Sequence, residues 1–172
     1  IQGSADLLQY ARTAGMAATA FDAMADQIGE NIAKVAGLYK IPIANIGELG
    51  DTINWLDDNA QSKGADIIDF LNRTSGVVST VSMSAQQSAA LGSTLLTPGE
   101  RAETASTATN AIVQKLAAAT KSTKKMKSAI AEIGMKPEAI QKGMSTDAIG
   151  TLLKVVDAIG KLPKDQRIGV MV

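Results

Sequence analysis

Apolar residues recur at steps of three and four along most of the chain, the spacing that places them on one face of an α-helix. The first run begins at Ser4, a capping residue type, and predicts one N-terminal helix that ends between Gly37 and Pro42. Its apolar positions are Leu7, Leu8, Ala11, Ala14, Ala18, Phe21, Ala25, Ile28, Ile32 and Val35. We therefore expect an N-terminal helix in residues 1–40 and a helical core in residues 41–172.

The same periodicity continues through the core. It predicts helices at residues 45–60, 65–73, 85–96, 103–119, 122–133, 138–142 and 146–162, and a further helix from Asp165 onward. Ser84 and Gln87 have the spacing of a capping box, and Ser145 is expected to cap the helix that follows it. Residues 76–82 form the only strand-like run, and a strand without a partner is unstable, so we expect a loop or a weak helix there. The predicted fold class is all-α, an array of roughly seven to nine helices.

Three apolar stripes, near residues 46–60, 103–119 and 145–162, are expected to pack together and to leave surplus faces for other proteins. The candidate packing and partner-contact residues are Leu49, Ile53, Trp55, Leu56, Ile112, Leu116, Ile149, Leu152, Val156 and Ile159. Trp55 lies among acidic residues, and we interpret it as a half-buried core residue in preference to a partner anchor.

A faint internal repeat accompanies these stripes. Residues 49–53 (LGDTI) resemble residues 91–95 (LGSTL), and residues 70–73 resemble residues 112–115, both at an offset of 42. Two related helical hairpins would explain the matches, and so would chance agreement of common residues. The glycines expected to permit helix crossing or bending are Gly47, Gly50, Gly150 and Gly160.

Composition removes much of the usual site chemistry. The 172 residues include no histidine and no cysteine. This excludes a thiol nucleophile, a Ser-His-Asp triad, a disulfide, and a zinc site built on imidazole or thiolate. Alanine contributes 28 residues, against 40 for Leu, Ile, Val and Phe together. Alanine-rich helices approach closely but make a thin core, so we expect self-association or burial in a larger assembly to complete it.

The 17 basic and 17 acidic side chains balance over the whole chain but not locally. Residues 1–75 hold 10 acidic and 5 basic groups, and residues 76–172 hold 7 acidic and 12 basic groups. Such a split suits intramolecular closure or head-to-tail packing of copies, although a local accident of composition gives the same pattern. The most concentrated lysines are Lys115, Lys121, Lys124, Lys125 and Lys127. Because no aromatic residue interleaves them, a solvated helix face is favoured over a nucleic-acid site.

Three patterns resemble catalytic or ligand sites, and each has a simpler interpretation. Ser122 and Lys125 have the S-x-x-K spacing of serine acyltransferases, but the sheet and further motifs of those enzymes are missing. Acid pairs at residues 57–58 and at Glu48 with Asp51 suit glycoside hydrolysis, although such pairs occur on most soluble helices. Residues 57–59 lack the alternating acids of a calcium loop. We therefore expect no enzymatic activity, no cofactor and no metal.

No run approaches the roughly 20 apolar residues of a membrane span. The most apolar stretch, residues 149–159, is interrupted by Lys154 and Asp157. Because the chain begins at Ile1 and ends at Val172, we expect a fragment of a longer protein, truncated at both ends.

Two long stretches resemble the core region of phage tail tape measure proteins. The first is IGELGDTINWLDDN, from Ile46, with the following SKGADIIDFLNRTSGVVSTVSMSAQQSAALGSTLL and AETASTATNAIVQKLA. The second is EIGMKPEAIQKGMSTDAIGTLLKVVDAIGKLPKDQR, in which a G-M-x-P-E step precedes an amphipathic helix that ends near Pro163. The resemblance covers most of the chain, roughly from Gly37 to Val172.

This resemblance implies a structural and assembly role. Tape measure proteins are long helical chains in the lumen of the phage tail tube, and their length sets the length of the tail. The resemblance also implies contacts with other copies, with tail tube subunits and with tail assembly chaperones, and a passage through the host cytoplasm during assembly. No sequence-specific nucleic acid is implied as a partner. The alternative from another class is a peptidoglycan-cleaving or other cell-wall-active domain of a phage tail protein.

Overall fold

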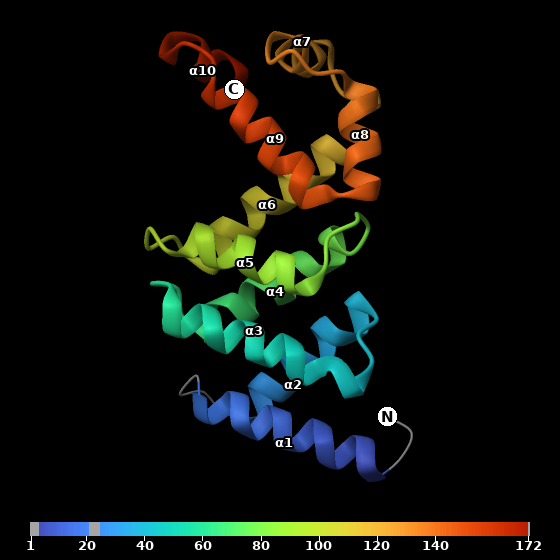
Figure 1. Cartoon of the computed structure of the whole chain (residues 1–172), viewed down its shortest axis with the longest axis vertical. Helices are drawn as coiled ribbons and strands as arrows, with labels where there is room; N and C mark the ends of the chain where they lie inside the picture. The colour runs from blue at the N-terminus through green and yellow to red at the C-terminus, as the bar shows by residue number, and fades with distance from the viewer. Residues whose placement is uncertain (1–3, 21–24, 172) are drawn as a thin grey trace. The chain divides into compact units, whose positions relative to one another are not determined.

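The computed structural model describes residues 4–20 and 25–171, which form ten α-helices and two short 3-10 helices. The helices in Figure 1 are α1 (Ser4–Ala20), α2 (Ala25–Tyr39), η1 (Ile43–Asn45), α3 (Ile46–Asn59), α4 (Gly64–Val78), α5 (Ala85–Leu96), α6 (Ala102–Ala117), η2 (Ala119–Lys121), α7 (Lys124–Glu132), α8 (Pro137–Thr146), α9 (Ala148–Gly160) and α10 (Lys164–Met171). No strand occurs in the described ranges, so the all-α prediction is confirmed.

The chain separates into two compact units. Unit 1 contains residues 1–79 and 84–109, and unit 2 contains residues 80–83 and 110–172. The expected division after residue 40 coincides with none of the three boundaries, after residues 79, 83 and 109, because α1 and α2 pack in the same unit as α3 and α4. As a statement about the domains of a longer protein, that division stays a prediction.

The N-terminal part of the chain is two helices, so the prediction of a single helix there is wrong. α1 and α2 pack against each other, and the Tyr10 hydroxyl donates a hydrogen bond to the carbonyl oxygen of Gly29 across the pair. Residues 21–24, which include the predicted inward residue Phe21, lie outside the described part of the chain. Folding back covers small apolar faces that one straight helix would leave in water.

Unit 1 is a stack of helical hairpins in two layers. In one layer α3 contacts both α1 and α5, and in the other α2 contacts α4 (Figure 1). The first helices of successive hairpins begin at Ser4, Ile46 and Ala85, a spacing of about 40 residues that is typical of two-helix solenoid repeats. The matched residues 49–53 and 91–95 fall on α3 and α5, which occupy equivalent places in one layer. Their common origin stays a prediction.

A close helix approach in the core of unit 1 joins α4 and α5. The ring of Phe70 is fully buried, and a Cβ atom placed on Gly92 would lie 2.5 Å from its Cδ1 and 2.9 Å from its Cε1. Glycine at this position therefore lets α5 settle on the ring. A Cβ atom added to the predicted crossing glycine Gly50 would lie 3.9 Å from Thr13 Cγ2 of α1, an ordinary contact, and one added to Gly47 would have no neighbour within 4 Å. Gly92 is therefore the glycine that a close crossing requires, whereas an alanine would fit at Gly47 and Gly50.

The end of α2 is fixed by one side chain and one unusual backbone conformation. The Tyr39 hydroxyl donates to Ser88 Oγ at 2.8 Å, and burial raises the pKa of Tyr39, an effect that this hydrogen bond partly offsets. Lys40 then has a φ of 54°, in the left-handed region, and the Ile41 N–H donates to the carbonyl oxygen of Ala36 at 2.8 Å. This geometry is a helix C-cap of the kind that glycine usually makes.

Helix starts and ends in unit 1 follow local chemistry. The Ser84–Gln87 capping box is confirmed: the Gln87 N–H donates to Ser84 Oγ at 3.1 Å, and the Ser84 N–H donates to Gln87 Oε1 at 2.9 Å. α4 extends to Val78, beyond the predicted end at residue 73, so the strand-like run at residues 76–82 is helix in its first part and loop after it.

Unit 2 packs the end of α6 with α7, α8, α9 and α10. Its buried apolar residues are Met83, Val113, Leu116, Ala119, Ile130, Ile140, Met144, Ala148, Leu152 and Val155. The loop at residues 80–83 belongs to this unit because Ser82 bridges two helices. Its N–H donates to the carbonyl oxygen of Met144, and its own carbonyl oxygen accepts from the N–H of Ala148, both at 3.0 Å.

The cap of α9 differs from the prediction. Ser145 lies inside α8, and Asp147 caps α9 by accepting a hydrogen bond from the Gly150 N–H at 3.0 Å. A side chain on Gly150 would collide with this carboxylate, so the glycine serves the cap and not a helix crossing. The close approach between α8 and α9 falls at Gly143, where a Cβ atom would collide with Thr151 Oγ1. Gly160 has no atom within 4 Å of an added Cβ.

The expectation that three apolar stripes pack together is also wrong. α3 buries its stripe among the helices of unit 1, whereas α9 buries one of its stripes in unit 2. α6 is shared, with residues 102–109 in unit 1 and residues 110–117 in unit 2. The two stripes are therefore parts of separate cores.

The contact of Phe70 with Gly92 generates a stability prediction. Gly92→Ala should lower the free energy of unfolding by about 1–3 kcal/mol, because a fully buried ring has no space to give way to a new methyl group. Gly76→Ala, on an exposed position of α4 with no atom within 4 Å, should be neutral or stabilising by up to about 1 kcal/mol. Urea denaturation followed by circular dichroism measures both. Equal effects of the two substitutions would contradict the packing described.

The left-handed conformation of Lys40 generates a second stability prediction. Lys40→Gly should raise the free energy of unfolding by about 1 kcal/mol, because glycine adopts this conformation without the steric cost of a Cβ atom. Lys34→Gly, at an exposed position inside α2, should lower it by about 1 kcal/mol. Thermal unfolding of the two variants is the measurement. A destabilised Lys40→Gly variant would contradict a left-handed conformation of Lys40 at the end of α2.

Candidate interaction surfaces

The ten candidate contact residues divide into three groups by burial. The buried ones are Leu49, Ile53, Leu56, Leu116 and Leu152. Ile149 and Ile159 are partly buried. The exposed ones are Trp55, Ile112 and Val156. Each residue of the first group is buried within its own unit, so the candidates available for contact with another protein are those of the exposed group.

Trp55 is 62% exposed, and its interpretation as a half-buried core residue is wrong. Leu49, Ile53 and Leu56 turn toward the core, and the helical rotation of about 100° per residue then carries Trp55 to the opposite side of α3. Three exposed acids, Glu48, Asp51 and Asp58, share that side with it. We call the surface formed by Glu48, Asp51, Trp55 and Asp58 the acidic face of α3.

α9 carries two apolar stripes, of which only one is covered. Residues 148, 151, 152 and 155 are buried in unit 2. Residues 149, 153, 156 and 160 lie on another side of the helix, where Leu153 is 58% exposed and Val156 is 59% exposed. A surface helix normally has one apolar stripe and an otherwise polar circumference. We call the four residues 149, 153, 156 and 160 the outer stripe of α9.

The two units carry opposite charge. Unit 1 contains 12 acidic and 6 basic side chains, and unit 2 contains 5 acidic and 11 basic ones. The net charges are thus −6 and +6, a stronger contrast than a division of the sequence near its middle gives. The lysine cluster belongs to unit 2, where all five lysines are exposed. Each unit therefore presents a field of one sign to an approaching molecule.

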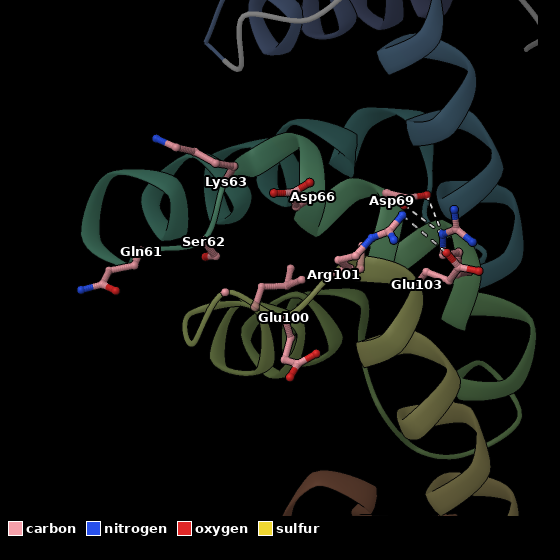
Figure 2. Close-up of a pocket in the computed structure, with 12 residues that line it drawn as sticks. Gln61, Ser62, Lys63, Asp66, Asp69, Glu100, Arg101 and Glu103 are labelled. Carbon is pink, nitrogen blue, oxygen red and sulfur yellow. Dashed lines mark hydrogen bonds and ion pairs between the residues drawn. The ribbon is translucent and has the colours of Figure 1, made fainter.

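A polar pocket of about 420 Å³ lies in unit 1, between the start of α4 and the start of α6 (Figure 2). Arg73 Nε donates to both carboxylate oxygens of Asp69 at 2.9 Å, and this hydrogen bond, followed by the Asp69 charge, raises the pKa of Arg73. Arg101 Nη2 lies 3.9 Å from Glu103 Oε2. This group was not predicted from the sequence, although the i,i+4 spacing of Asp69 and Arg73 on a helix indicates an ion pair.

The pocket has the features of a charged helix junction and lacks those of a sugar site. Acidic and basic side chains alternate around it, and Figure 2 shows Gln61, Lys63 and Glu100 directed away from its centre. None of its 12 lining residues is aromatic, so no ring is available there to stack on a sugar. The ion pairs are exposed and contribute little to stability.

Side chains from the catalytic motifs considered in the sequence make hydrogen bonds at helix ends. Ser122 Oγ donates to the carbonyl oxygen of Ala119 at 2.6 Å, and Thr123, not Ser122, caps α7. Asp57 Oδ1 accepts a hydrogen bond from the Gly64 N–H at 2.6 Å, at the start of α4. Among residues 4–20 and 25–171, no group of three or more acidic residues is placed to hold a metal ion. Within the same ranges, no helix has the length and apolar character needed to cross a membrane.

Comparison with known proteins agrees with the resemblance drawn from the sequence. The family model described as phage-related minor tail protein matches residues 2–172. A curated relative, a probable tape measure protein of Halomonas phage phiHAP-1, is 27% identical over 161 residues, which is 94% of this chain and 19% of the relative. The chain thus spans about a fifth of the length of that protein. No solved structure matches.

The family match covers nearly the whole chain and includes both units. The expected resemblance to tape measure proteins is confirmed by this match together with the relative. The chain belongs to the family of phage-related minor tail proteins, which are components of the phage tail.

Proposed function

We propose that this chain is a structural segment of a tape measure protein, that it occupies the lumen of the tail tube, and that it contributes to tail length without any enzymatic activity. The observation that supports this most strongly is the match to a probable tape measure protein along 94% of the chain. Its partners under this proposal are tail tube subunits and tail assembly chaperones, met in the host cytoplasm during assembly. The segment then remains in the virion tail.

The arrangement of the helices limits how much of the tail's length such a segment can span. The longest helix, α1, has 17 residues, and the chain reverses between successive helices of unit 1. At about 1.5 Å per residue, 172 residues in one straight helix would reach roughly 260 Å. A chain that reverses between successive helices spans less than this. The proposal therefore assigns the segment a length contribution below that of a continuous helix.

Deletion within the full-length protein tests the tail-length role. Removal of residues 4–171 in frame should yield tails that are shorter than normal, by less than roughly 260 Å if the hairpins persist in the tail. Electron microscopy of purified virions measures tail length. A matched control carries Leu38→Ala alone, at an exposed position of α2, which leaves chain length unchanged and should leave tail length unchanged. Normal tail length after the deletion would contradict a role in setting it.

The rival function, cleavage of peptidoglycan, makes the opposite biochemical prediction. Incubation of the chain with purified cell walls should release neither reducing sugar nor peptide fragments, because its acidic pairs cap a helix or lie on an open face. A characterised cell-wall hydrolase serves as the positive control. Release of fragments that is lost in an Asp57→Asn, Asp58→Asn variant would favour the enzyme.

A further inference from the structure

The acidic face of α3 is a surface without a partner in the described structure of unit 1. Trp55 is the chain's single tryptophan, and 62% of it is exposed beside three acids on the same side of the helix. Tryptophan buried at the centre of an interface is among the side chains that contribute most to binding. A large ring held in water on an ordered helix is therefore a candidate anchor for another protein.

The outer stripe of α9 has the complementary character. Leu153 and Val156 are one helical turn apart and more than half exposed, and Gly160 on the same stripe has no atom within 4 Å of an added Cβ. The stripe therefore offers exposed apolar side chains that an aromatic ring from another chain can contact. It stands on the unit with a net charge of +6, and the exposed charged residues that flank it in sequence are Lys154, Asp157 and Lys161, with a net charge of +1.

Charge decides which surfaces of two copies meet. A contact between two acidic faces would bring six carboxylates together, and a contact between two copies of unit 2 would oppose two charges of +6. Like charges across an interface cost several kcal/mol. A contact between unit 1 of one copy and unit 2 of another brings opposite charges together and covers apolar surface on both sides.

We propose that the acidic face of α3 in one copy of the chain docks on the outer stripe of α9 in a second copy, with Trp55 as the anchor. The contact is heterologous, so each added copy leaves one acidic face and one outer stripe free, and assembly continues until a ring closes or a filament forms. This inference does not depend on the tail-length role, because it concerns only the association of the chain with itself.

Two variants that each disable one surface test the proposal. The α3 variant is Trp55→Ala with Asp51→Lys, and the α9 variant is Leu153→Glu with Val156→Glu. Sedimentation of the 172-residue chain over a concentration series at low salt should show mass increasing with concentration. Each variant alone should associate at least about tenfold more weakly, since it lacks either the tryptophan anchor or the apolar side chains that the tryptophan contacts. An equimolar mixture of the two should form a dimer and nothing larger, because one intact surface of each kind remains.

Further outcomes separate this proposal from other arrangements. Leu38→Ala, an exposed leucine on α2, should leave association unchanged, and 0.5 M NaCl should weaken it because the charges are exposed. A wild-type chain that stays monomeric at every concentration would overturn the proposal. That result would mean either that the two surfaces contact each other within one chain or that they bind a different protein. Undiminished self-association of the α9 variant, or a mixture that fails to form dimers, would overturn it as well.

Discussion

The stack of hairpins in unit 1 depends on the close approach of α4 and α5 at Phe70 and Gly92. A chain with 28 alanines and two phenylalanines has few large side chains to fill space between helices. It gains dispersion contacts by bringing backbones together, and one glycine opposite one ring makes that possible. Gly143 against Thr151 does the same for α8 and α9 in unit 2. Small residues at helix crossings are thus the common device of both cores.

Because the cores are built from small side chains, some large apolar residues are left on the surface. Trp55, Leu153 and Val156 are each more than half exposed, while the cores bury alanine, serine and threonine beside their aliphatic residues. Because the two units have opposite net charges, electrostatics favour contact between unit 1 of one copy and unit 2 of another.

Periodicity was sufficient to predict nearly all helices, since the stripe of α3 and the capping box of α5 are local features. What it missed depends on tertiary contacts. The chain reversal between α1 and α2 leaves no clear break in the apolar pattern. The sequence favours Ser145 as the cap of α9, because only the structure shows that Gly150 leaves room for the Asp147 carboxylate. Trp55 was placed inward because hydrophobicity alone does not tell which side of a helix a neighbour covers. The residues of the buried stripes were predictable, whereas the exposed surfaces were not.

The central claim is that this tail component works through complementary surfaces on its two units. A photo-crosslinking amino acid at position 59 of the full-length protein, an exposed position one turn from Trp55 on α3, incorporated into assembled phage tails, tests it most directly. With isotopically mixed copies, mass spectrometry identifies whether a crosslink joins two chains. The account predicts crosslinks from position 59 to residues 149–160 of a different copy. Crosslinks confined to the same chain, or to an unrelated tail protein, would contradict it.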